Sequence, residues 1–239
     1  MHITFLAHSG FLVELEHAVL LFDWWKGELP PLPEDKPVLV LVSHHHEDHF
    51  NPAVFSLAQS GRTVRFLLGK DIRLSPANRR RWGVTEEIRA LCQCVGGFRT
   101  VEPLPGIRVE TLPSTDEGVA FLVSTEGRTI YHAGDLHWWH WEGEPDPWNP
   151  DMARRFRDFT RPLAGRHIDL AMVPLDSRLG TAEDWGLAYL LELADLDHVL
   201  PMHQWGNFAA TVRFCEKHPQ WASRILEIRR EGQTFALNF

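Results

Sequence analysis

"PVLVLVSHHHEDHF", residues 37 to 50, joins an almost unbroken apolar run to a cluster of four histidines and two carboxylates. Such an apolar run is typical of a strand whose two faces are both covered. The stretch that follows begins with Asn51 and Pro52 and ends with Gly61, which predicts a capped helix over residues 52–60. We therefore expect the histidines to lie in a loop between a buried strand and the start of a helix.

The spacing within this cluster favours metal binding over a polar surface loop. In an extended segment, side chains two residues apart point the same way, so His44 and His46 can reach one ion while His45 points elsewhere. Where the chain turns toward the helix, Asp48 and His49 can face a second ion. Imidazole and carboxylate ligands suit zinc, iron or manganese.

The composition is that of an ordinary globular protein, with 239 residues, 44% of them hydrophobic and 23% charged. The 24 Lys and Arg residues against 32 Asp and Glu residues give a net charge of −8, which argues against broad binding to nucleic acid. No apolar stretch is long enough for a membrane helix, and the N-terminus does not resemble a signal peptide. Together with three cysteines that form no disulfide framework, this predicts a cytoplasmic protein.

The hydrophobic pattern predicts strands first and a strand–helix alternation later. Short segments rich in Ile, Val, Leu and Phe fill residues 2–23, and a strand-like pattern returns over 92–132. Further along we expect helices at about 150–163, 181–197 and 208–217, and strands at 168–176, 198–203 and 232–239. Thr181 is the expected cap of the second of these helices. We predict one α/β domain over residues 1–239, with two sheets inside and helices outside.

The pattern His-x-His-x-Asp-His at residues 44–49 resembles the signature of the metallo-β-lactamase superfamily, and the resemblance spans nearly the whole chain. It implies a four-layer αβ/βα sandwich with the metals at one edge of the two sheets. "RTIYHAGDLHW" is similar to the family's strand that ends in Gly-Asp, which gives Asp135 the role of bridging both ions. "HVLPMHQWGNF" is similar to the late segment that carries the last ligand, which gives that role to His203. Asp48, His49, Asp135 and His203 would then complete one site.

The second site, with His44, His46 and the shared Asp135, lacks the third histidine of the family. The matching stretch, "TLPSTDEGVAFLV" at 111–123, contains Ser, Thr, Asp and Glu at 114–117 instead.

Three alternatives follow for this site. Asp116 or a hydroxyl replaces the histidine; His137 or His140 swings in from "HWWHW"; or the site is weak and the enzyme is mononuclear.

Catalysis in this setting would use a metal-activated water. Asp48 is the expected catalytic residue, because it can orient that water while it ligates. The leaving group then needs a proton, and the candidates are His8, His137 and His140.

Other residues are candidates for the surroundings of the site. Asp23 ends a strand and is placed to accept a hydrogen bond from a ligand histidine. Asp176 and Arg178 follow a later strand, and Arg178 is a candidate for holding a carboxylate or phosphate, with a helix-capping or interdomain salt bridge as the alternative. Tryptophans are frequent next to the expected site, at positions 24, 25, 138, 139, 141 and 205. The loop "DLHWWHWEGEPDPW" is expected to cover it.

The leading hypothesis is a hydrolase that uses one or two zinc ions, or manganese or iron, on a small ester, lactone or phosphorylated metabolite. Within the superfamily the chain resembles the small lactonase-like members. One alternative is a metal-dependent nuclease or phosphodiesterase of the same fold, although the acidic net charge makes nucleic acid an unfavourable partner. Another is a catalytically weak metal-binding or ligand-binding member, which the missing histidine would explain.

Overall fold

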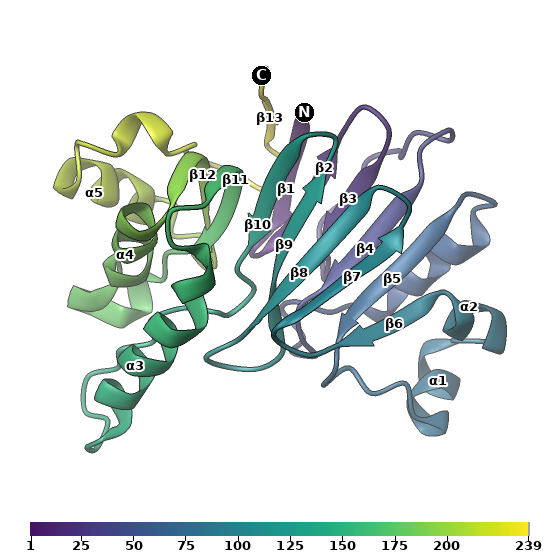
Figure 1. Ribbon diagram of the computed structural model, residues 1–239, viewed down its shortest axis with the longest axis horizontal. Helices are drawn as coiled ribbons and strands as arrows, with labels where there is room; N and C mark the ends of the chain where they lie inside the picture. The colour runs from purple at the N-terminus through teal and green to yellow at the C-terminus, as the bar shows by residue number, and fades with distance from the viewer. Residues whose placement is uncertain (239) are drawn as a thin grey trace.

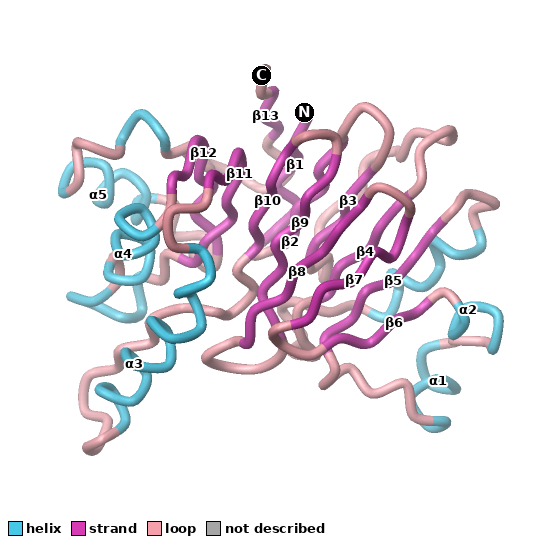
Figure 2. Tube along the Cα trace, viewed as in Figure 1, coloured by secondary structure: helices cyan, strands magenta, loops and turns pink. Residues whose placement is uncertain are grey.

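The computed structural model describes residues 1–238, and these fold as two β-sheets packed face to face (Figures 1 and 2). The first sheet contains, in spatial order, β13 (Thr234–Ala236), β1 (His2–Ala7), β2 (Gly10–Glu14), β3 (Val19–Phe22), β4 (Val38–Val42), β5 (Val64–Gly69) and β6 (Cys92–Val95). The second contains β12 (Asp195–Met202), β11 (His167–Pro174), β10 (Arg128–His132), β9 (Val119–Thr125), β8 (Ile107–Pro113) and β7 (Arg99–Leu104).

Helices cover the outer face of each sheet (Figure 1). Beside the first sheet lie η1 (Pro52–Gln59), α1 (Pro76–Trp82) and α2 (Glu86–Ala90). Beside the second lie α3 (Trp148–Thr160), α4 (Trp185–Leu193) and α5 (Ala209–Lys217), with short turns η2 (Arg161–Leu163), η3 (Ser177–Ala182) and η4 (Ala222–Arg224). The predicted four-layer αβ/βα sandwich is thus confirmed. Within residues 1–238, no helix is both long and apolar enough to cross a membrane.

The sequence of strand β4 is apolar throughout because both of its faces are buried. Leu39 and Leu41 join the core that lies between the sheets, whereas Val38, Val40 and Val42 join a second core under η1 and α2. Successive side chains of a strand point to opposite faces, so a strand covered on both sides needs apolar residues at every position. β4 also pairs in parallel with β3 and β5, as buried parallel strands do.

Two expected helices differ from the structure, one in its type and the other in its bounds. The helix after the histidine cluster is a 3₁₀-helix, Pro52–Gln59, capped by Asn51 as predicted. Thr181 does not cap the later helix, because it lies in η3 and α4 begins only at Trp185. That helix also ends before Asp195, where the backbone pairs in parallel with β11. The hydrogen bonds of this long-range pairing outweigh the local helical pattern.

A close approach of two loops positions the site. Val119 donates its backbone N–H to the carbonyl of Ser43, so the segment 114–118 lies directly on the end of β4. Gly118 has φ +71°, and a Cβ there would lie 2.0 Å from the Ser43 carbonyl oxygen and 2.6 Å from the Cβ of His44. Only glycine fits this contact without displacing backbone.

Gly118→Ala is therefore expected to lower the free energy of unfolding by about 1–3 kcal/mol more than Gly127→Ala. Gly127 is a matched control, because it has the same φ of +71° but no atom within 4 Å of an added Cβ. Urea unfolding followed by circular dichroism measures both losses. Equal losses would show that the contact with Ser43 does not constrain the loop.

A buried carboxylate joins the two last helices. Asp184, which precedes α4, accepts hydrogen bonds from Lys217 Nζ at 2.7 Å and His218 Nε2 at 2.6 Å, both at the end of α5. Burial alone would raise the pKa of Asp184, but these two partners outweigh it and lower the pKa below its usual value.

Asp184→Asn is expected to lower the free energy of unfolding by about 1–3 kcal/mol near neutral pH, because it removes a buried charge-assisted contact. The pKa of Asp184 in the folded protein lies below its usual value of 3.8. The contact therefore stabilises the folded protein above pH 3.8, and this stabilisation is lost as the pH falls through the folded pKa. Unfolding curves of the wild type and the variant should therefore converge in acid. The exposed Asp158, paired with Arg154, is the control, and Asp158→Asn should change stability by less than about 1 kcal/mol.

Candidate metal centre

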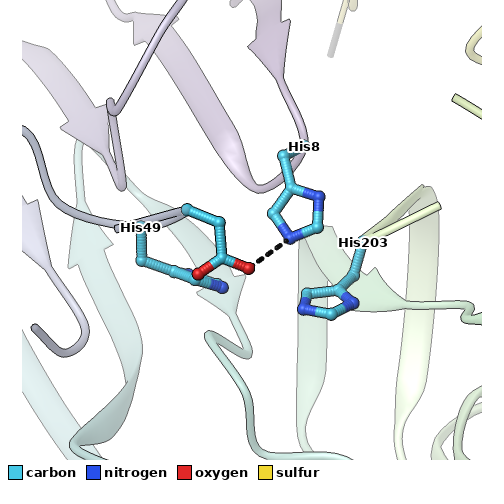
Figure 3. Close-up of side chains that lie close together, drawn as sticks. His8, His49 and His203 are labelled. Atoms are coloured by element: carbon cyan, nitrogen blue, oxygen red, sulfur yellow. Dashed lines mark ion pairs between the residues drawn. The ribbon is translucent and has the colours of Figure 1, made fainter. Parts of the chain in front are cut away.

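Three histidines from distant parts of the chain converge at one edge of the sheets (Figure 3). His8 lies in the turn after β1, His49 in the loop after β4, and His203 directly after β12. His8 and His203 have φ values of 54° and 61°, a region that non-glycine residues seldom adopt. The backbone N–H of His203 donates to the carbonyl of His8, so the two strained turns support each other.

The first ligand group contains His8, Asp48, His49 and His203, whose ligand atoms all lie within 4.8 Å of one another. His8 Nε2 is 3.3 Å from Asp48 Oδ2, the ion pair drawn in Figure 3. Asp135 Oδ1 lies beside this group, 3.1 Å from His49 Nε2 and 3.5 Å from His203 Nε2.

The second ligand group contains His44, His46, Asp116 and Asp135. His46 Nδ1 is 3.6 Å from Asp116 Oδ2, and His44 Nε2 is 3.6 Å from Asp135 Oδ2. Asp135 therefore presents one carboxylate oxygen to each group, and Asp116 occupies the place for which the sequence left several alternatives.

The structure does not bring His137 or His140 into either group. His137 is fully buried, and its backbone is held by Thr115, whose Oγ1 accepts from His137 N–H and donates to the His137 carbonyl. His140 packs against the ring of Trp185 instead. The hydroxyls of 114–115 are also occupied, since Ser114 Oγ accepts from the N–H of Asp116. These contacts hold the loop and leave the Asp116 carboxylate to face the cluster.

The inner atoms of the cluster fit a cation. Within residues 1–238, His8 Nε2, His49 Nε2 and Asp135 Oδ1 are buried and make no hydrogen bond of acceptable geometry. His49 Nε2 and Asp135 Oδ1 are close, but they are not aligned as donor and acceptor. Buried polar atoms are costly without a partner, and imidazole nitrogens and carboxylate oxygens are the donor set of zinc, manganese and iron.

The charges of the cluster are set by burial and by neighbouring ions. Burial lowers the pKa of His8 and of His44 to about 4, so both rings are neutral near pH 7 and offer lone pairs. Burial alone would raise the pKa of Asp135, but His49 and His203 hold it well below its usual value. Burial alone would lower the pKa of His49, but Asp135 and Asp23 raise it well above its usual value. A cation that binds His49 and Asp135 must therefore displace a proton.

Two buried carboxylates orient the histidine rings from behind. Asp23 accepts hydrogen bonds from His49 Nδ1 at 2.7 Å and from both the N–H and the hydroxyl of Ser43. Asp176 Oδ2 accepts from His203 Nδ1 at 2.9 Å. Such partners fix the ring that faces a metal. Sequence reasoning missed Ser43, although its position between the strand and the cluster was a usable signal. His45 points away, as expected, and pairs with Asp71.

A cavity of about 550 Å³ opens over the cluster. Its base contains ligand residues from both groups: His46, Asp48, Asp116, Asp135 and His203. Its walls contain Trp139, Trp141, Trp148, Trp205, Met152, Arg155 and Arg178.

The tryptophan-rich loop thus lies at the cavity, as predicted, but only Trp139, Trp141 and Trp205 of the expected tryptophans line it. Sequence reasoning missed the wall that α3 provides through Trp148 and Arg155, although their helical spacing was visible in the sequence.

Known proteins share this sequence pattern and fold. A family model described as Beta-lactamase superfamily domain matches residues 2–144. A protein of Nitratidesulfovibrio vulgaris (strain DP4), named UPF0173 metal-dependent hydrolase, is 30% identical over 232 residues, covering 90% of this chain and 86% of the relative. A protein with the same name from Korarchaeum cryptofilum (strain OPF8) is 27% identical over 214 residues, covering 85% of this chain and 82% of the relative.

A solved structure has the same arrangement of sheets and helices. Igni18, a metallo hydrolase from the archaeon Ignicoccus hospitalis KIN4/I, has a TM-score of 0.66 with this chain at 18% identity, covering 100% of this chain and 98% of its own. At this identity the likeness shows a shared fold. The family match, the extent of the relatives and the fold lead to one conclusion: the chain belongs to the metallo-β-lactamase superfamily and is a metal-dependent hydrolase.

Proposed function

We propose that the cluster holds two divalent cations bridged by Asp135 and that the protein hydrolyses a small ester, lactone or phosphorylated metabolite there. The first cation would be held by Asp48, His49 and His203, and the second by His44, His46 and Asp116, with Asp135 shared. The observation that carries this proposal is the position of Asp116, 3.6 Å from His46 Nδ1, because it completes a four-ligand set that lacks a histidine.

The donor atoms suggest which cations fit. The first set has two imidazoles and two carboxylates, which suits zinc, and the second set has the same composition once Asp116 replaces a histidine. Each added carboxylate moves the preference toward harder ions, so manganese and iron are the alternatives to zinc.

A divalent cation in such a site lowers the pKa of a bound water and polarises a carbonyl or phosphoryl oxygen. The residues of the chain supply the rest of the chemistry. Asp48 lines the cavity and is assigned to orient the attacking water and to carry its proton to the leaving oxygen. The water oxygen forms the new bond to carbon or phosphorus as the bond to the leaving oxygen breaks. His8 is a positioning residue, since its ring lies against Asp48 Oδ2.

Replacing Asp116 tests the ligand sets directly. Asp116→Ala is expected to reduce the bound metal from two ions to about one per chain, and Asp116→His to restore the second. Mass spectrometry of the metals retained after dialysis measures both. Asp158→Ala is the control, because this exposed acid of α3 belongs to none of the groups of histidines and acids that could hold a metal within residues 1–238. Two ions retained by Asp116→Ala would remove Asp116 from the site.

Turnover is tested with protein loaded separately with zinc, manganese or iron. Lactones, carboxylic esters, and phosphate mono- and diesters are assayed side by side. Asp48→Asn is expected to lower kcat by about 10²–10⁴-fold on any substrate that is cleaved, because it removes the proposed proton carrier and weakens a proposed metal ligand; the metal retained by the variant is measured to separate the two effects. Protein that binds two ions and cleaves none of these classes would contradict the proposed function.

A further inference from the structure

One wall of the cavity is rich in tryptophan. The rings of Trp139 and Trp141 are parallel, with an interplanar angle of 3° and centroids 6.2 Å apart. Trp148 and Trp205 line the same cavity and remain 37% and 51% exposed. Large aromatic rings left open to solvent around a polar site are typical of a surface that binds a flat apolar group.

A guanidinium group is held within this wall. The Arg178 group lies over Trp205 at 4.8 Å and over Trp141 at 5.7 Å from the ring centroids. Its Nε and Nη2 atoms donate to the carboxylate of Asp176, whereas its Nη1 atom makes no hydrogen bond within residues 1–238. Arg178 therefore has a fixed orientation and retains three N–H donors, two on Nη1 and one on Nη2.

A second guanidinium reaches the cavity from α3. Trp148, Met152 and Arg155 are spaced by four and three residues, so they share one face of the helix, and all three line the cavity. Arg155 is half-buried beside Phe159 and forms no ion pair with any residue from 1 to 238. The remaining acid on this wall, Asp151, is already paired with Arg154 at 2.8 Å.

We infer that the cavity binds a substrate that carries an oxyanionic group, a carboxylate or a phosphate, next to a planar apolar body. This inference rests on the proposed function, because the reacting ester, lactone or phosphate bond must lie over the ligand cluster. The planar body then lies along the tryptophan wall. The oxyanionic group, which does not react, is bound by Arg155 and by Nη1 of Arg178. A guanidinium fork matches carboxylates and phosphates alike, so both sources share this chemistry.

Binding without turnover tests this inference. Isothermal titration of the zinc-loaded protein compares benzoate and phenylphosphonate with acetate, which is anionic but not planar, and with benzyl alcohol, which is planar but neutral. Benzoate or phenylphosphonate is expected to bind at least about tenfold more tightly than either comparison ligand. The tighter of the two identifies the carboxylate or the phosphate as the preferred group. Equal affinity for all four ligands would overturn the inference.

Variants distinguish anion binding by the arginines from anion binding by the metals. Arg155→Gln and Arg178→Gln are each expected to weaken the binding of the preferred anion about tenfold and to leave benzyl alcohol unchanged. Arg80→Gln, on the exposed side of α1, makes the same charge change outside the cavity and should alter neither ligand. Retained metal is measured for each variant, because Arg178 also contacts Asp176. Anion binding that persists in both cavity variants would assign the anion to the metals and overturn the inference.

The outcomes also separate this inference from the proposed function. Arginine-dependent binding of planar anions by a protein that cleaves no ester, lactone or phosphate would support the inference and contradict the proposed function. Cleavage of neutral and anionic aryl esters with equal kcat/KM, unchanged by Arg155→Gln, would support the proposed function and overturn the inference.

Discussion

The site depends on the contacts of the Asp135 carboxylate with imidazole rings that follow strands of both sheets. It follows β10 of the second sheet, whereas His44 and His49 follow β4 of the first. A buried carboxylate is stable only where its charge is compensated, and here nearby histidines hold its pKa well below the usual value. The two sheets must therefore approach closely at this edge. Gly134, next to Asp135, allows this, since a Cβ there would lie 2.7 Å from the Cβ of Ser43.

Charged contacts extend from Asp135 both toward the core and toward the cavity. Carboxylates and imidazoles alternate along one path from the core to the cavity, through Asp23, His49, Asp135, His203 and Asp176, and the path ends at Arg178. Hydrogen bonds hold the two ends of this path, from His49 to Asp23 and from His203 and Arg178 to Asp176, whereas Asp135 lies close to His49 and His203 without an aligned hydrogen bond. The orientation of the inner rings therefore depends on residues outside the cluster. The guanidinium that faces the cavity is thus physically connected to a histidine of the cluster.

The loop 114–118 brings a carboxylate to the second ligand group. A carboxylate, Asp116, stands where a histidine is expected, and the hydroxyls of Ser114 and Thr115 hold the backbone around it. Thr115 joins this loop to the backbone of His137, whose ring is buried and belongs to neither ligand group. The short segment 114–118 thereby brings the carboxylate of Asp116 to within 3.6 Å of His46.

The sequence by itself determined much of the protein. The apolar run of β4 and the cluster at residues 44–49 were readable from local spacing, and the resemblance pointed to Asp135 and His203; the structure brings all of these side chains together. Local spacing is reliable here because a strand repeats every two residues and because these residues closely follow strands. The hydrophobic pattern predicted two sheets inside and helices outside, and the resemblance implied the four-layer αβ/βα sandwich. The start of β12 at Asp195 was not readable, because its partner strand begins 28 residues earlier, at His167.

Only the tertiary structure decided which of several chemically suitable residues reach the site. The sequence could not distinguish between Asp116, His137 and His140 as the replacement for the missing histidine. Nor could it show which of the tryptophans line the cavity. The choice among them depends on the backbone contacts of Thr115 and on the close approach of Gly118 to Ser43. The same holds for Arg155 and Arg178, which come from separate segments and line the same cavity. Such choices depend on contacts between distant parts of the chain, and neither periodicity nor composition reports on those contacts.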